Sequence, residues 1–192
     1  MPVLALRGLV VFPHTMITFD VGRAKSIAAV EEAMGRDQMI LLTAQKDENV
    51  DDPTPDDLYA VGTLCRIDQV MSLPDDNMRV LAEGVDRAEI LAFVTEDPTF
   101  HARIRRLEET AEDTVELEAT VRAAHDFFEQ YAQTSQRVSP EIVTSVNEMN
   151  AAGALADLLA TNVVQDLKEK QSLLEELDAR RRLERVCLAL AK

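Results

Sequence analysis

The spacing of apolar residues changes once along this chain of 192 residues, and the change falls near Glu108. Before it, apolar side chains alternate with polar ones or form short runs, which is typical of β-strands. After it they recur every three or four residues, which is typical of amphipathic helices. The sequence therefore predicts an α+β protein: a β-rich lobe over residues 1–108, followed by an α-helical bundle lobe over residues 109–192. No Gly or Pro lies at the change, so we expect two lobes in contact rather than two domains on a tether.

The β-rich lobe is expected to contain many short strands and one helix. Phe100, Ala102 and Ile104 alternate with polar or charged residues, as on a half-buried strand. Residues 22–35 have helical spacing and end at a glycine. The expected strands cover residues 3–6, 9–12, 16–19, 39–42, 61–71, 78–83, 85–94 and 100–107. This pattern is typical of a compact barrel or sandwich.

The second lobe is expected to contain five helices. Their apolar stripes lie within residues 117–131, 142–149, 155–159, 167–177 and 183–190. Ser139 before Pro140, and Asp178 before the last stripe, have the residue types preferred at helix N-caps. The last helix reaches Lys192 without a Gly or Pro stop, so we interpret it as a truncated longer helix.

The sequence contains no motif for catalysis or for metal binding. None of the six glycines precedes a lysine, so the GxxxxGK[ST] phosphate loop is missing, and so is the GxSxG motif. His14, His101 and His125 lie far apart, and no HExxH motif or Cys/His cluster has metal-ligand spacing. We therefore expect no enzymatic activity in this chain, no metal and no cofactor.

The net charge of −15 restricts the partners of the chain. Residues 1–108 carry −8 and residues 109–192 carry −7, so neither lobe offers the basic face that nucleic acid or an anionic membrane requires. No signal peptide and no apolar run of about 20 residues appears, so we expect a cytoplasmic protein without a membrane span. Cys65 and Cys187 lie in apolar patterns and are interpreted as buried, reduced thiols; the alternative, a single disulfide that links the two parts, has no support in the sequence.

An acidic loop that contains two prolines leads into the strand expected at residues 61–71. Its sequence is Asp51-Asp52-Pro53-Thr54-Pro55-Asp56-Asp57-Leu58-Tyr59-Ala60-Val61-Gly62-Thr63. Two further stretches accompany it, Leu6-Arg7-Gly8-Leu9-Val10-Val11-Phe12-Pro13-His14 and Asp20-Val21-Gly22-Arg23-Ala24-Lys25-Ser26. With residues 44–47, 80–84, 155–157, 168–175 and 182–186, they cover nearly the whole chain in order. In these stretches the chain resembles the N-terminal substrate-binding domain of the Lon family of ATP-dependent proteases.

This resemblance implies a PUA-like pseudo-barrel for the β-rich lobe. It also implies that the ATPase and Ser-Lys protease modules of such an enzyme lie downstream of this region. The chain would then be a non-catalytic module for substrate recognition and assembly in a hexameric, ATP-dependent serine protease. Its partners would be unfolded or misfolded proteins and further copies of the same protein.

Candidate substrate-contact residues are apolar side chains in polar surroundings on the expected strands. Leu81 stands between Arg79 and Glu83, which share its strand face. The full candidate set is Leu81, Met16, Ile17, Met71 and Leu73. The functional interpretation is a surface that samples apolar segments of unfolded proteins, for which flexible methionines are well suited. The alternative is that all five are ordinary core or lobe-contact residues.

Three other functions are compatible with the resemblance. The chain could be a complete, stand-alone Lon-domain adaptor, and the length of the natural reading frame would distinguish this from a protease fragment. A small-ligand module is disfavoured because the chain contains no Trp for an aromatic cage. A PUA-like RNA binder is disfavoured by the charge of −8 on residues 1–108.

Overall fold

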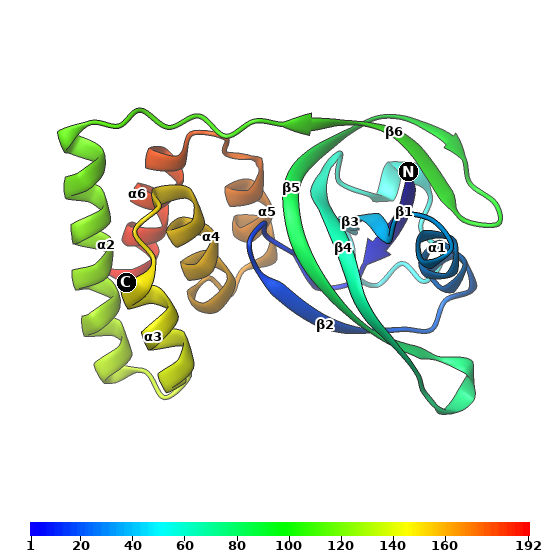
Figure 1. The fold of residues 1–192 in the computed structure, drawn as a ribbon, viewed down its shortest axis with the longest axis horizontal. Helices are drawn as coiled ribbons and strands as arrows, with labels where there is room; N and C mark the ends of the chain where they lie inside the picture. The colour runs from blue at the N-terminus through cyan, green and yellow to red at the C-terminus, as the bar shows by residue number, and fades with distance from the viewer. The chain divides into compact units, whose positions relative to one another are not determined.

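A computed structural model describes residues 1–192, which form two compact units (Figure 1). The first, Met1–Leu107, holds all six strands and is called the β-unit below; the second, Glu108–Lys192, holds five helices and is called the helical unit. The predicted α+β class is confirmed. No helix is both long and apolar enough to cross a membrane.

The six strands of the β-unit form one mixed sheet. They are β1 (Pro2–Leu6), β2 (Met16–Val21), β3 (Met39–Ala44), β4 (Val61–Ser72), β5 (Met78–Thr95) and β6 (Phe100–Leu107). Their order is β2-β5-β4-β3-β1-β6, and β6 also pairs with β5. β1 and β3 are parallel, and the other pairs are antiparallel. Because β6 pairs with both β1 and β5, five strands close into a ring, and β2 extends the sheet beside β5 (Figure 1).

The single long helix of the β-unit, α1 (Ala24–Met34), packs its small apolar residues into the core. Ala29, Val30 and Ala33 are buried there with side chains from β1, β3, β4 and β5. A second apolar cluster around Phe100 and Leu64 fills the other part of the unit. The helix expected over residues 22–35 is therefore confirmed, and it closes one side of the barrel-like sheet.

β5 differs from the sequence expectation, which divides residues 78–94 into two strands at Gly84. The structure shows one continuous strand of 18 residues. Leu64 pairs with Asp86 and Cys65 pairs with Gly84, so Val85 is an extra residue without a partner on β4. Such a bulge bends a strand without ending it. The bend lets one strand pair with β2 at its start and with β6 at its end.

The expected strand at residues 9–12 is also wrong. This segment is not part of the sheet, although residues 10–12 are buried. Gly8 adopts a positive φ of 63°, which turns the chain after β1. The carbonyl oxygen of Val11 accepts a hydrogen bond of 2.5 Å from the Thr63 hydroxyl, so a side chain replaces strand pairing there.

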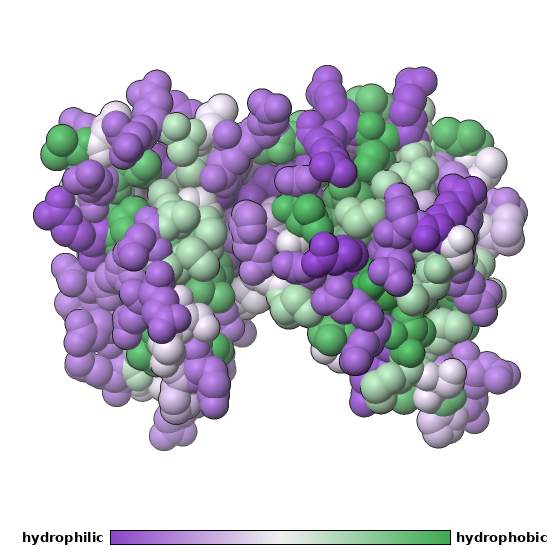
Figure 2. Space-filling model, in the orientation of Figure 1, coloured by the Kyte–Doolittle hydropathy of each residue, from purple (hydrophilic) through white to green (hydrophobic).

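The five helices expected in the helical unit are confirmed. They are α2 (Val115–Thr134), α3 (Pro140–Glu148), α4 (Ala152–Val163), α5 (Leu167–Glu175) and α6 (Ala179–Leu190). The Ser139 hydroxyl accepts from the Ile142 N–H at 3.4 Å, and the Asp178 carboxylate accepts from the Arg181 N–H at 3.1 Å. Both predicted N-caps are thus present. Hydrophilic residues cover most of this unit's visible surface, and hydrophobic ones reach it only at scattered positions (Figure 2).

Candidate functional site

Leu81 lies at the centre of three neighbouring strands, on the face that points away from the core. The sheet register places it opposite Thr18 of β2 and Gln69 of β4. The next residues on either side, Val80 and Ala82, are fully buried. Since side chains alternate along a strand, Leu81 must point outward, and it is partly exposed. The residues paired directly with it are polar, and so are its neighbours on this face of β5, Arg79 and Glu83.

Met16 and Met71 flank Leu81 on the same outer face. Met16 pairs with Glu83 and Met71 pairs with Arg79, so each methionine is diagonal to Leu81. Diagonal neighbours are about 7–8 Å apart, which is within reach of long side chains. Met16 is 52% exposed and Met71 is 53% exposed, so about half of each residue is open to solvent. Leu81, Met16 and Met71 are called the apolar patch below.

Two ion pairs border the apolar patch. Arg79 donates to Asp20 across β5 and β2, with 2.8 Å between Nε and Oδ1, and Arg66 pairs with Glu83 across β4 and β5. The hydrogen bond from Arg79 lowers the pKa of the Asp20 carboxyl. Exposed pairs of this kind add little stability. Their charged groups instead form a polar rim around apolar side chains, as in protein–protein contact surfaces.

The other two candidates are not part of this patch. Ile17 follows Met16 directly, so it points to the opposite face, where it packs against the core cluster. The interpretation of Met16 and Ile17 as one surface pair is therefore corrected. Leu73 lies just beyond β4, where its N–H donates to the carbonyl oxygen of Asn77 at 2.8 Å across the hairpin turn. It is partly exposed at the end of β4.

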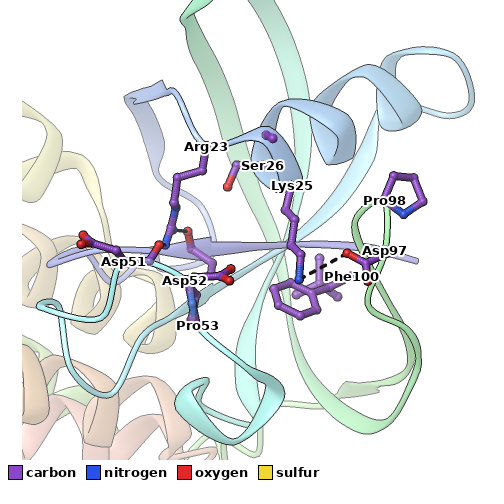
Figure 3. A pocket seen from close by; sticks show the side chains of 12 residues that line it. Arg23, Lys25, Ser26, Asp51, Asp52, Pro53, Asp97, Pro98 and Phe100 are labelled. Atoms are coloured by element: carbon purple, nitrogen blue, oxygen red, sulfur yellow. Dashed lines mark hydrogen bonds and ion pairs between the residues drawn. The ribbon is translucent and has the colours of Figure 1, made fainter.

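The structure also reveals a cavity of about 430 Å³ that sequence reasoning missed (Figure 3). It lies where the first turn of α1 meets the acidic loop at residues 51–53 and the turn at residues 97–98. Two of the stretches that carry the family resemblance, residues 20–26 and 51–63, therefore come together in space. Nothing in the sequence pattern of either stretch indicates that the other is its neighbour.

Arg23 holds the acidic loop against the sheet at this place. Its guanidinium donates to the Gln45 Oε1 atom at 2.6 Å and to the Ala5 carbonyl oxygen at 2.7 Å. The Gln45 amide in turn donates to the carbonyl oxygen of Val50 at 2.9 Å. Partial burial lowers the pKa of Arg23, because desolvation disfavours the charged form. The loop is thus fixed by a network that starts at one arginine.

The histidines are not gathered into a catalytic or metal site. His101 bonds Glu32 through Nε2 at 2.6 Å and Thr95 through Nδ1 at 2.7 Å, whereas His14 is exposed and His125 belongs to α2. No group of three or more His, Cys, Asp or Glu side chains is placed to hold a metal ion. Both the apolar patch and the cavity beside α1 have a polarity or a shape suited to binding.

Comparison with known proteins extends the resemblance over the full chain. Residues 1–192 match the family described as the ATP-dependent protease La (LON) substrate-binding domain. Lon protease of Desulforamulus reducens is 42% identical over 192 residues, which is 100% of this chain and 24% of that protein. Lon protease of Azospirillum brasilense is 43% identical over 185 residues, covering 96% of this chain and 23% of that protein. The chain therefore spans about a quarter of the length of these curated relatives.

Solved structures share the fold at lower sequence identity. The N-terminal domain of Lon protease from the Mycobacterium avium complex matches with a TM-score of 0.80 at 22% identity, covering 100% of this chain and 97% of the other. A Lon N-terminal domain protein from Xanthomonas campestris matches with a TM-score of 0.64 at 18% identity, covering 97% and 95%. Because the family match extends over every residue, this chain belongs to the LON substrate-binding domain family.

Proposed function

We propose that this chain is the non-catalytic substrate-recognition and assembly module of an ATP-dependent Lon-type serine protease. Its apolar patch contacts exposed apolar segments of unfolded or damaged proteins. The observation that carries the proposal is Leu81, an outward-facing apolar side chain between two half-exposed methionines. Membership of a substrate-binding family supports protein ligands, and the ion pairs at the border provide a polar rim.

The size of the apolar patch determines how tightly one copy can bind. Burying one large apolar side chain contributes about 1.5–3 kcal/mol. Association costs at least about 4 kcal/mol in lost freedom of motion. Three side chains therefore give a dissociation constant nearer the millimolar than the nanomolar range. Useful affinity requires several copies acting together, and the hexameric parent protein that the family resemblance implies, in the cytoplasm, would supply that avidity.

The test is capture of an unfolded protein by the 192-residue chain, displayed in many copies on a sensor surface. The probe is a permanently unfolded, carboxymethylated protein, compared with its folded form. We expect the surface to retain the unfolded form and not the folded one. Leu81→Ser should weaken this retention by up to about tenfold, the loss that corresponds to one apolar contact.

Leu91→Ser is the matched control, because Leu91 is on the same strand and is 45% exposed, but lies outside the apolar patch. It should leave capture unchanged. Equal losses for the two variants would mean general surface stickiness and would contradict the proposed site. Thermal melting completes the test: if Leu81→Ser unfolds the chain, Leu81 is a core residue and the assignment is wrong.

A further inference from the structure

We propose that the cavity beside the N-terminus of α1 binds a single carboxylate attached to a small apolar group. This site is separate from the apolar patch and does not depend on the proposed function. Val3 and Ala5 of β1 line one side of the cavity and provide an apolar wall. The ring of Phe100 of β6 adds to this wall (Figure 3). The volume of about 430 Å³ is in the range of small-molecule pockets. An amino-acid-sized group fits this space.

The first turn of α1 supplies hydrogen-bond donors at this cavity. The first backbone hydrogen bond of the helix joins the Ile27 N–H to the Arg23 carbonyl oxygen at 2.9 Å, which leaves the N–H groups of Ala24, Lys25 and Ser26 without helical partners. No side chain caps these groups, and the first turn contains no acidic residue. Free N–H groups and the positive end of the helix dipole together favour an anion.

Ser26 independently indicates a ligand. Its side chain lines the cavity and its hydroxyl points into it, although the residue is only 7% exposed (Figure 3). The hydroxyl makes no hydrogen bond within the protein and faces the cavity, where water or a ligand reaches it. Buried polar groups are nearly always hydrogen-bonded. A carboxylate seated on the first turn of α1 would accept from this hydroxyl as well as from the backbone.

Lys25 places a positive charge beside the apolar wall. Its Nζ lies 4.7 Å from the centroid of the Phe100 ring and 3.6 Å from Asp97 Oδ1 (Figure 3). The Thr99 hydroxyl donates to the Lys25 carbonyl oxygen at 2.7 Å, which ties the neighbouring turn to the helix. A ligand with an apolar body on Phe100 would therefore have a cation within reach of its acid group.

Three carboxylates at the rim restrict the charge of the ligand. Asp51, Asp52 and Asp97 line the cavity, and all three are exposed to water. Asp51 is already paired with Arg7 at 2.9 Å, and Asp97 lies beside Lys25. Their negative charge repels any anion, and it repels phosphate esters and other multiply charged anions more strongly than a single carboxylate. The site therefore favours a ligand with one negative charge, seated at the helix, over a nucleotide with several.

The test is a ¹H–¹⁵N NMR titration of the 192-residue chain with two probes, 3-phenylpropionate and the tripeptide Ala-Ala-Phe. Both carry a carboxylate on an apolar group, and the comparison tells a small acid from a peptide C-terminus. We expect shifts at the amides of residues 24–26. Two control compounds, in which the carboxylate of each probe is replaced by an uncharged carboxamide, should bind at least about tenfold more weakly. This is the loss expected when a hydrogen bond to a charged group is removed. Tighter binding of inorganic triphosphate than of either probe would overturn the proposal.

Ser26→Ala should weaken binding at least about tenfold and leave the melting temperature unchanged, because the hydroxyl that it removes faces the cavity and makes no hydrogen bond within the protein. Ser72→Ala, at an exposed position at the end of β4, is the control and should bind normally. Lys25→Met keeps an apolar stem over Phe100 and removes the charge, so it should also weaken binding. Normal binding by both Ser26→Ala and Lys25→Met would overturn the proposal, whatever their melting temperatures.

Discussion

Arg182 of α6 and Asp157 of α4 form an ion pair in the interior of the helical unit, with 3.0 Å between Nε and Oδ1. The two side chains are 0% and 1% exposed. Arg182 also donates to the carbonyl oxygens of Glu176 at 2.7 Å and Gly153 at 3.3 Å, and it contacts the Glu109 carboxylate. One guanidinium thereby joins two helices and the segment that precedes α2.

Arg182→Met should destabilise the helical unit strongly. The substitution keeps much of the side-chain volume but leaves the Asp157 carboxylate buried without its cation. Removing one partner of a buried pair costs about 3–5 kcal/mol. Urea unfolding followed by far-UV circular dichroism measures the loss.

The neighbouring Arg181→Ala is the matched control, because Arg181 is exposed and lies 3.7 Å from Asp178. It should change the free energy of unfolding by no more than about 1 kcal/mol. A loss for Arg182→Met as small as that of the control would show that the buried pair does not hold the unit together.

Gly84→Ala should be severely destabilising, since the backbone of Phe12 passes directly over this residue of β5. A Cβ at Gly84 would overlap the Phe12 carbonyl oxygen and lie 3.1 Å from the Cα of Pro13. Hydrogen bonds of 2.9 Å from the His14 N–H to the Gly84 carbonyl and from the Gly84 N–H to the Thr15 carbonyl hold the two segments together. The chain can relieve the clash only by breaking these contacts.

Gly35→Ala provides the comparison for thermal melting. A Cβ there would meet its nearest atom at 3.5 Å, an ordinary contact, and Gly35 has φ −77°, which alanine adopts freely. This variant should melt at or slightly above the wild-type temperature, because alanine reduces the freedom of the unfolded chain. If both variants melt alike, the close approach of Phe12 does not constrain Gly84.

The helices of this protein can be predicted from the sequence because their signals are local. Each apolar stripe lies within one segment, and residues such as Ser139 and Asp178 cap the helix that follows them. The continuity of β5 cannot be predicted in this way. The bulge at Val85 exists only because β4 changes register opposite it, and β4 lies some 20 residues away in sequence.

The candidate surfaces can be predicted from the sequence only in part, for the same reason. Alternation along one strand is sufficient to place Leu81 with Arg79 and Glu83. It cannot show that Met16 and Met71 flank Leu81, because that depends on pairing of β2 and β4 with β5. The cavity beside α1 cannot be predicted from local sequence patterns for the same reason, since its lining, which includes Ser26, comes from four separate parts of the chain.

Alkaline pH should reduce stability through the two buried thiols. Burial raises the pKa of Cys65 to about 12 and that of Cys187 to about 11, whereas the ordinary value is 9.0. The unfolded chain therefore loses these protons first as pH rises. Their contribution to stability is complete below pH 9 and is lost between pH 9 and about 12. Urea unfolding at pH 8 and pH 10.5 measures this fall.

A variant with both Cys65→Ala and Cys187→Ala isolates the thiol contribution. It will be less stable at pH 8, because two buried side chains are shortened, so the quantity to compare is the change between the two pH values. That change should be smaller than in the wild type. An equal fall in both proteins would assign the alkaline sensitivity to other groups.

The methionines of the apolar patch offer a test that separates apolar from electrostatic capture. Replacing Met16 and Met71 together with serine should weaken retention of a carboxymethylated, unfolded protein by up to about tenfold per lost contact. Each exposed substitution should change the free energy of unfolding by no more than about 0.5 kcal/mol. Retention is measured on a multicopy surface at 0.05 M and 0.5 M salt. Because the contact is apolar, wild-type retention should not fall at the higher salt concentration.

Met34→Ser serves as the control for the methionine variant, because Met34 is an exposed methionine of the β-unit at the end of α1, outside the apolar patch. It should retain the unfolded protein as the wild type does. Strong loss of wild-type retention in 0.5 M salt would instead assign capture to charged groups such as Arg66 and Arg79, which border the patch. In that case the double methionine variant and the wild type should lose retention together, and the apolar patch would not be the contact surface.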